Sequence, residues 1–360
     1  MNLSFLLRSS FFLAIGITCA MKQGFCESDI DTRVSRLEAD MKKVRGQTAF
    51  GNYGAKTPSA APQTNGFGYF ITADFLWWKL YEFQDDFVYK DKKTTGVPPF
   101  KGKVENVDFN WEPGFRVGAG YVFDYDGWDV SFHFTDYETH ASNSKHSSSK
   151  GFLLPIWDFD ILPLSKIHTH WEVHYFDLDL VLGRNYFVSK YLSLRPFIGL
   201  ASTWINQHKR AKEVVFAFPN VVAKVKGKNN FWGIGPRLGL DSQFFLGRHF
   251  SLYGNVEGSL LWGRFDVHEK ESIKALDAVI YDENLNTHRM APMVACGLGV
   301  AFETNFNKNE NHFLVKLGYE SQYWWQQNQF PVLYLPSFSQ KRESGDLSIA
   351  GLTLDFRLDF

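Results

Sequence analysis

Hydrophobic and polar residues alternate along most of the chain after residue 66. Near its end, Leu352, Leu354 and Phe356 share one face, whereas Thr353 and Asp355 share the other. A period of two residues is that of a β-strand. The pattern predicts about ten strands, within a range of roughly eight to twelve. The expected strands cover 69–80, 115–123, 128–134, 174–182, 192–200, 232–240, 252–262, 290–302, 313–319 and 350–360.

The connections between the expected strands alternate in length. Short ones lie near 124–127, 187–191, 246–249 and 305–311, and long ones cover 82–110, 140–170, 208–228, 264–289 and 326–345. Barrels of the bacterial outer membrane combine short periplasmic turns with long outer loops. We therefore predict an all-β fold, a transmembrane antiparallel up-and-down β-barrel over residues 67–360 in a Gram-negative outer membrane. Its termini are expected in the periplasm and its long loops outside.

Aromatic residues gather at both ends of the expected strands, as in the girdles of membrane barrels. The predicted outer girdle consists of Trp77, Trp78, Trp111, Trp171, Trp204, Trp232, Trp262, Trp324 and Trp325. A last strand that ends in an aromatic residue is typical of the signal bound by the barrel-insertion machinery. Phe356, Leu358 and Phe360 are predicted to form that signal.

The polar faces of the expected strands predict what lines the barrel. The predicted lumen-facing charges are Arg116, Asp129, Asp177, Asp179, Arg195, Arg237, Asp241, Glu257, Glu303, Lys316, Glu320, Asp355 and Arg357. Acidic residues outnumber basic ones, which suggests mild cation selectivity. Glycines on the same faces, such as Gly118, Gly239 and Gly318, either leave open space or ease strand curvature. Since roughly eight strands make a barrel that side chains can fill, about ten strands lie near the closed end of the size range.

The residues before the expected barrel fall into three segments. Residues 1–20 predict a signal peptide, with cleavage after Ala20 or as late as Cys26. Residues 28–45 place apolar side chains at heptad spacing, which predicts a short helix. That helix either forms a coiled coil that holds a homo-oligomer such as a trimer, or lies on a surface as an amphipathic helix. Residues 46–66, rich in Gly, Ala and Pro, predict a flexible linker.

Composition and charge exclude several classes of function. The net charge of -1 excludes a nucleic-acid-binding surface. Aromatic residues make up 17% of the chain, yet no apolar run of helical membrane-spanning length follows residue 20. Cys19, Cys26 and Cys296 show neither metal-binding spacing nor a disulfide framework. We expect no metal and no cofactor.

Two long connections have unusual composition. The third is basic, with Lys209, Arg210, Lys212, Lys224, Lys226 and Lys228 against Glu213. It is either an ordinary solvated loop or a contact to outer-membrane lipid, through the phosphates of lipopolysaccharide. The second contains the apolar run FLLPIWDFDILP at 152–163. This run enters the barrel mouth, packs on a neighbouring subunit or contacts a host surface.

An outer-rim hydrolase is the alternative that would need catalytic groups. Its candidate residues are His133, Asp136, His140, His168 and His170. A hydrolase needs a base held by a partner next to a nucleophile or water, and these residues show no such spacing. They fit ordinary polar rim residues, so we predict that the protein is not an enzyme.

Several blocks resemble a known family. The segments ADFLWWK at 73–79, GFRVGAGYVF at 114–123 and the run at 176–207 are similar to the Legionella-type pore-forming outer membrane proteins, which distantly resemble the chlamydial major outer membrane protein. The resemblance implies an abundant surface barrel with porin-like activity and assigns no catalytic or binding residues. The chain departs from the chlamydial proteins in having few cysteines, which argues against a disulfide-linked envelope. The predicted function is porin-like passage of ions or small solutes with a structural role in the envelope; the alternatives are a surface adhesin and the hydrolase.

Overall fold

The computed structural model describes residues 68–83, 85–91, 102–123, 127–147, 151–156, 163–189, 191–246, 249–306, 311–334, 339–342 and 344–360. The predicted signal peptide, heptad helix and linker lie outside the described residues. Within these ranges, none of the helical segments has the length and apolar character needed to cross a membrane.

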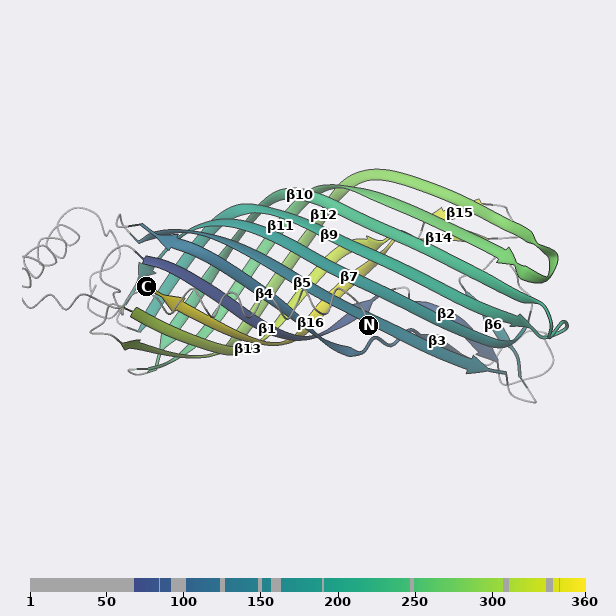
Figure 1. Ribbon diagram of the computed structural model, residues 1–360, viewed down its shortest axis with the longest axis horizontal. Coiled ribbons are helices and arrows are strands. Elements are labelled where there is room, and N and C mark those ends of the chain that lie inside the picture. Colours follow the sequence, from purple (N-terminus) through teal and green to yellow (C-terminus); the bar gives the residue numbers. More distant parts are fainter. Residues whose placement is uncertain are drawn as a thin grey trace, which may run out of the picture. The chain divides into compact units, whose positions relative to one another are not determined.

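Antiparallel strands close into a barrel in sequence order (Figure 1). β1 pairs with β4 on one side and with β16 on the other, and β7 pairs with β9. This ring confirms the predicted up-and-down barrel of about ten strands. Its strands are β1 (Gly68–Glu82), β4 (Trp111–Val122), β5 (Trp128–His146), β7 (Leu164–Arg184), β9 (Leu192–Val215), β10 (Val222–Phe245), β11 (Phe250–Ile273), β12 (Ala278–Phe306), β13 (Asn311–Asn328) and β16 (Gly345–Asp359).

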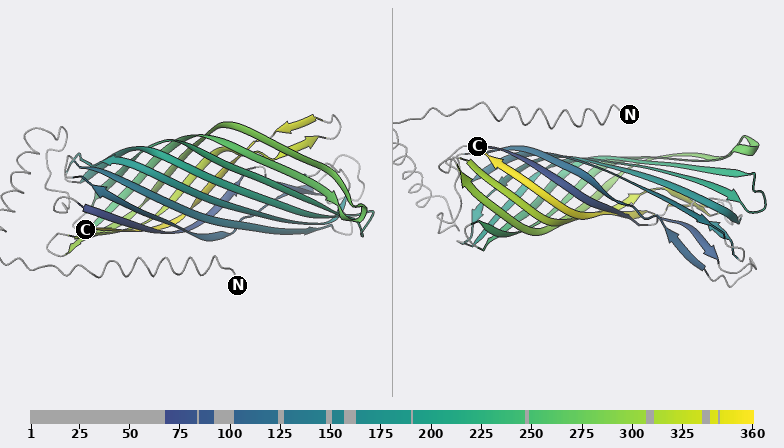
Figure 2. Two further views of the ribbon diagram at one scale, coloured as in Figure 1. Left: turned by 45° about the horizontal axis from the view of Figure 1, so that its top comes forward. Right: turned by 60° about the horizontal axis from the view of Figure 1, so that its bottom comes forward.

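Short extra strands accompany the barrel. β2 (Asp86–Asp91) and β3 (Gly102–Asn106) form a hairpin that joins β7 through β6 (Leu153–Pro155), and β8 (Tyr186–Phe187) pairs with β9. Figure 2 shows β2 and β3 beside the far ends of the long strands. A separate hairpin consists of β14 (Pro331–Tyr334) and β15 (Ser339–Arg342). The first long connection thus contains regular structure.

Several strands are much longer than the alternation predicts. β9, β10 and β11 have 24 residues each and β12 has 29. The connections expected at 208–228 and 264–289 are therefore mostly strand, with turns only near 216–221 and at the short helix η2 (Lys274–Leu276). The prediction of long loops there is wrong because the alternation of a strand continues. In this part of the strands the polar residues of the alternation face outward, so the segments do not look like membrane strands.

The change from apolar to polar outward residues occurs at one level of the barrel wall. On the outside of β10, Leu238, Ile234 and Trp232 are exposed and apolar, whereas the next outward residues are Asn230 and Lys228. We call the apolar part of the wall the apolar belt. It includes Phe75, Phe132, Leu180, Ile198, Leu200, Ile234, Leu238, Val256, Leu298, Leu317 and Leu352.

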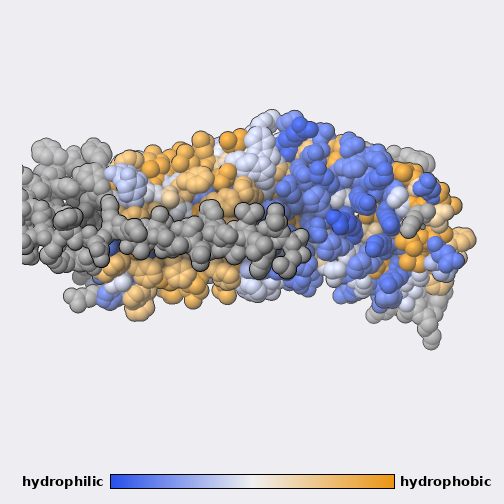
Figure 3. All heavy atoms as spheres, viewed as in Figure 1, coloured by the Kyte–Doolittle hydropathy of each residue, from blue (hydrophilic) through white to orange (hydrophobic). Residues whose placement is uncertain are grey.

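The belt adjoins the end of the barrel that holds Phe360 and the short connections predicted near 124–127, 187–191, 246–249 and 305–311, which we call the short-turn end. Figure 3 shows apolar residues over this part of the wall and a hydrophilic surface over the long strands beyond it. Exposed apolar side chains on this scale fit a hydrocarbon environment and not water. Beyond the belt the outside is polar, and the inside combines apolar residues such as Phe231 and Phe265 with buried charged ones such as Lys209 and Glu269.

Candidate functional site

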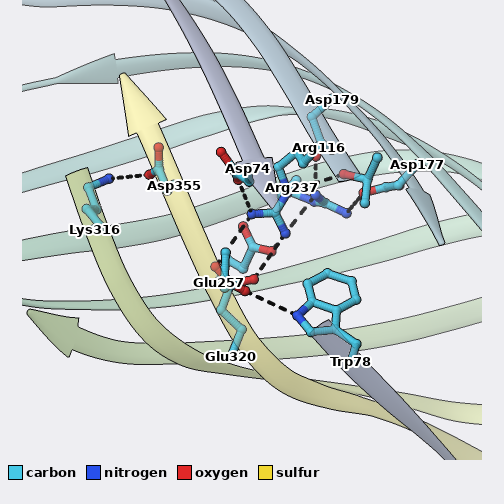
Figure 4. A network of polar contacts seen from close by, with 12 residues as sticks. Asp74, Trp78, Arg116, Asp177, Asp179, Arg237, Glu257, Lys316, Glu320 and Asp355 are labelled. Carbon is cyan, nitrogen blue, oxygen red and sulfur yellow. Dashed lines mark hydrogen bonds and ion pairs between the residues drawn. The ribbon is translucent and has the colours of Figure 1, made fainter. Parts of the chain in front are cut away.

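Charged side chains from strands around the barrel meet in its interior (Figure 4). Arg116 on β4 donates to Asp74 on β1 at 3.0 Å and to Glu320 on β13 at 3.1 Å. The Arg116 guanidinium also lies 5.6 Å from the ring centre of Trp78. One guanidinium therefore ties together two carboxylates and an aromatic ring from β1 and β13.

A second cluster forms around Arg237 on β10, which is only 3% exposed. It donates to Asp179 at 2.5 Å and to Asp177 at 2.9 Å, both on β7. Glu257 on β11 lies 3.9 Å away, and Thr203 donates to Asp177. A buried guanidinium needs this many acceptors, because unpaired charge in a low-dielectric interior is costly.

Other ion pairs lie closer to the short-turn end and are more open to water. Arg195 binds Asp129 at 2.5 Å and Asp241 at 2.8 Å, and Lys316 binds Asp355 at 3.0 Å. The Asp241 side chain is 41% exposed. This part of the interior is consequently a polar vestibule that water reaches.

All the charged residues predicted to face the lumen lie on the inward faces of their strands. Glu303 accepts a hydrogen bond from Gln243 at 3.1 Å, and Arg357 donates to Asp359 at 2.6 Å. Asp74 belongs to the network although the predicted set omits it. The inward face of β1 continues with Leu76 and Trp78, so the alternation around Asp74 is weak. Phe70, Thr72 and Asp74 alternate with outward residues along β1, and this spacing could have placed Asp74 on the inward face.

An apolar layer closes the barrel beyond the charge network. Trp78, Tyr137, Tyr175 and Trp324 face inward from different strands and are at most 1% exposed. The ring centres of Trp78 and Tyr137 are 5.7 Å apart, and those of Tyr175 and Trp324 are 6.1 Å apart. We call these four residues the aromatic layer. Since an open lumen would expose them to water, the barrel is filled at this level.

The predicted tryptophan girdle is wrong for three of its residues, which point into the barrel. Trp77, Trp111, Trp232, Trp262 and Trp325 are exposed, and Trp204 faces outward against Trp232 with ring centres 6.4 Å apart. Trp78, Trp171 and Trp324 instead point inside. Neighbouring strand residues face opposite sides of the wall, so only one of Trp77–Trp78 and one of Trp324–Trp325 can face lipid. Trp171 lies where the outside has already become polar.

The inward glycines do not leave open space. A side chain at Gly318 would meet the Tyr253 hydroxyl at 2.1 Å, and one at Gly120 would meet the Phe70 ring at 2.2 Å. At Gly239 the Phe197 ring lies 2.4 Å from the position of an added Cβ. The glycines make room for aromatic side chains of nearby strands, and these fill the barrel.

The hydrolase candidates lie on both sides of the barrel wall, and two of them, His140 and His170, are neighbours with ring centres 6.2 Å apart. His133 faces the interior, whereas Asp136 lies on the outer wall, 2.6 Å from His174. On the same outer wall, His140 pairs with Glu112 at 3.6 Å and His170 with Glu172 at 2.9 Å. Ser144 Oγ lies 2.7 Å from Nδ1 of His168. In the part of the chain that the structure describes, no group of His, Cys, Asp and Glu could hold a metal ion.

The basic residues at 208–228 and the apolar run at 152–163 each place some side chains inside the barrel and others outside the buried interior or outside the described residues. Lys209 points inside, 2.8 Å from Glu269 and 4.0 Å from the centre of the Phe330 ring. The other basic residues of that connection face outward. Leu153 is fully buried at the far end of the barrel, and residues 157–162 of the apolar run lie outside the described residues.

The last strand places its apolar residues on the outer wall. Phe356 and Phe360 are exposed, with Leu358 half-buried between them. Backbone hydrogen bonds of 3.0 and 2.9 Å join Phe360 to Tyr69 and close the barrel. The predicted insertion signal therefore lies on the lipid-facing side of the closing pair of strands.

Comparison with known proteins identifies the family to which the chain belongs. The chain gives no match among curated protein sequences. Solved structures similar to this chain include the outer membrane protease OmpT of Escherichia coli (8% identity, 83% of this chain and 99% of that one, TM-score 0.42). They also include Ail of Yersinia pestis (12%, 81% and 99%, 0.22) and a FadL homologue of Pseudomonas aeruginosa (9%, 87% and 93%, 0.27). Residues 61–360 match the family of the Legionella pneumophila major outer membrane protein precursor, and the chain belongs to this outer-membrane barrel family.

Proposed function

We propose that this protein is a porin-like barrel that lets small ions, preferentially cations, pass the outer membrane. The observation that supports this most directly is the charged interior beneath the apolar belt, where carboxylates outnumber cationic groups. Arg116, Arg195 and Arg237 are each shared between two or more carboxylates. The remaining negative charge favours cations over anions.

The aromatic layer is the proposed constriction. Water reaches the vestibule around Asp241 and Lys316 but not Tyr175 or Trp324. Conduction therefore requires a movement of the layer.

We further propose that the short-turn end and both termini lie in the periplasm, and that residues 28–45 hold an oligomer.

The test is single-channel recording of the full mature chain in a planar bilayer. We expect rare, small steps, with reversal potentials in a salt gradient that favour the cation. Trp324→Ala should increase the open probability, because it removes one of the two indole rings of the layer, whereas Trp232→Ala on the outer wall should not. Silence of the native and Trp324→Ala proteins, both folded, or preference for chloride, contradicts the proposal.

We propose that the protein catalyses no reaction. His140 and His170 lie side by side on the outer wall, but each binds its own carboxylate, Glu112 or Glu172. Asp136 binds His174 on the same wall, and none of these pairs holds a base next to a nucleophile. Cells that carry Asp136→Asn should cleave fluorogenic peptides as fast as cells with the native protein. A rate that falls with this substitution would favour the hydrolase.

Adhesion is the weaker alternative. It is less favoured because Leu153, in the apolar run, is buried in the barrel and cannot contact a host. Deletion of 157–162 should leave cell attachment unchanged; its loss with an intact barrel would support an adhesin.

A further inference from the structure

The outer wall beyond the apolar belt carries a row of cations on β9 and β10. Arg210 and Lys212 on β9 face outward, as do Lys224, Lys226 and Lys228 on β10. We call these five residues the basic patch. It lies within the hydrophilic surface that adjoins the belt (Figure 3).

The strand register places like charges opposite each other. Lys224 faces Lys212, and Lys226 faces Arg210 on one side and Lys270 on the other. Lys228 faces His208. Like charges directly opposite each other in a sheet are destabilising. Such an arrangement is stabilised when an anion binds between the strands.

Carboxylates of the protein neutralise only the margins of the patch. Glu172 lies 3.9 Å from Arg210, and Asp282 binds Lys270 at 2.8 Å. Across the described ranges, Lys212, Lys224, Lys226 and Lys228 form no ion pair with a carboxylate within 4.0 Å. Their charge is thus available to a ligand.

The position of the patch identifies the ligand. Trp204 and Trp232, paired across β9 and β10, mark the edge of the belt. Lys228 lies four residues from Trp232 on the same face, which is roughly 10 Å along a tilted barrel axis. A lipid with its acyl chains against the belt would hold its headgroup at this height.

We infer that the basic patch binds the phosphates of outer-leaflet lipopolysaccharide packed against β9 and β10. Lysine and arginine form strong charge-assisted hydrogen bonds to phosphate. The inference rests on the proposed orientation, with the long strands outside, but not on ion conduction.

The test measures binding of lipid A by the full mature protein in detergent micelles with EDTA, using native mass spectrometry. The variant is Lys224→Gln/Lys226→Gln/Lys228→Gln, and the matched control is Lys90→Gln/Lys103→Gln on the β2–β3 hairpin. The triple variant should bind bis-phosphorylated lipid A about 100-fold more weakly, since each cation near an anionic lipid contributes roughly fivefold. The control should bind like the native protein.

Three results would overturn the inference. One is equal binding of dephosphorylated lipid A by the native protein, which would mean that the acyl chains alone are recognised. Another is displacement of lipid A by an equal concentration of inorganic phosphate, which would indicate a site for a free anion. The third is unchanged affinity in the folded triple variant.

Orientation has its own measurement. Lys226→Cys should react with a membrane-impermeant maleimide on intact cells, whereas the native protein should not. Labelling only after the outer membrane is permeabilised would put the patch in the periplasm and refute the lipopolysaccharide contact. Because channel recordings do not depend on the patch, that outcome leaves the proposed porin function to be judged separately.

Discussion

Single residues inside the barrel depend on partners from distant parts of the chain. Arg237 is the clearest case, because its guanidinium is buried and bound by Asp177 and Asp179. Removing one member of a buried ion pair leaves the others charged and unpaired, which costs more than the pair itself contributes.

Arg237→Met should destabilise the folded barrel by about 3–5 kcal/mol, because Asp177 and Asp179 lose their counter-ion. Urea unfolding in lipid vesicles, followed by the heat-dependent gel shift, measures the change. The control is Arg264→Met, an exposed arginine on the outer wall of β11, which should change stability little. Equal midpoints for the two variants would show that the buried network contributes little to stability.

Asp85, between β1 and β2, is a titratable residue outside the barrel wall. Burial raises the pKa of its carboxyl to about 6, although Asn106 Nδ2 donates a hydrogen bond to it at 3.0 Å. The unfolded chain has a pKa of about 4. The folded state therefore holds the proton more tightly, and its stability falls as pH rises from about 4 to about 6.

Carbon-13 NMR of labelled protein in nanodiscs should show Asp85 titrating near pH 6. Asp85→Asn removes the titrating group, so the loss of stability over this interval should become smaller. A midpoint near 4 would mean that water reaches the carboxyl.

At the scale of single elements, the long strands combine two environments. On β10, the outer residues change from Leu238 and Trp232 to Lys228, while the inner residues change from Arg237 to Phe231. The period of two persists, so the backbone pairing with β9 and β11 continues across the boundary. What changes is only which side faces the apolar medium.

The short strand β6 depends on Leu153, which is fully buried, whereas its neighbour Leu154 is half-buried. Leu153→Ala should weaken the attachment of β2 and β6 to the barrel by about 2–5 kcal/mol through the cavity it leaves. Hydrogen exchange of peptides from β2 should then become faster, with the barrel strands unaffected. Leu154→Ala is the control, and equal exchange in both variants would contradict the assigned packing.

For the whole molecule, tryptophan residues lie in two different places, at the edge of the apolar belt and in the filled interior. Trp232 and Trp262 face outward at the edge of the belt, and Trp78 and Trp324 face inward. Lipids brominated on their acyl chains quench only indoles that they can approach.

Trp232→Phe should therefore remove fluorescence that brominated lipid quenches, and Trp324→Phe should remove fluorescence that it does not quench. The comparison of each variant in brominated and ordinary vesicles measures both fractions. If loss of Trp324 reduced the quenched fraction as much as loss of Trp232, the aromatic layer would not lie inside the barrel.

The sequence by itself determined the barrel, its strands and the inward side of each charged residue, because alternation is a local property that a single segment displays. The family resemblance agreed with this. The extent of the strands could not be predicted by a search for apolar outer faces, since beyond Trp232 the outer face becomes polar.

Only the tertiary structure decided what fills the barrel. Trp78, Tyr137, Tyr175 and Trp324 lie on four different strands, and their contacts arise only when the sheet closes and sets its register. The folded barrel also pairs Arg237 with Asp177, and the register of the β9–β10 pair places Lys226 opposite Arg210. A sequence fixes the side of the wall that each residue occupies, but the neighbours across the wall depend on pairings between residues far apart in the chain.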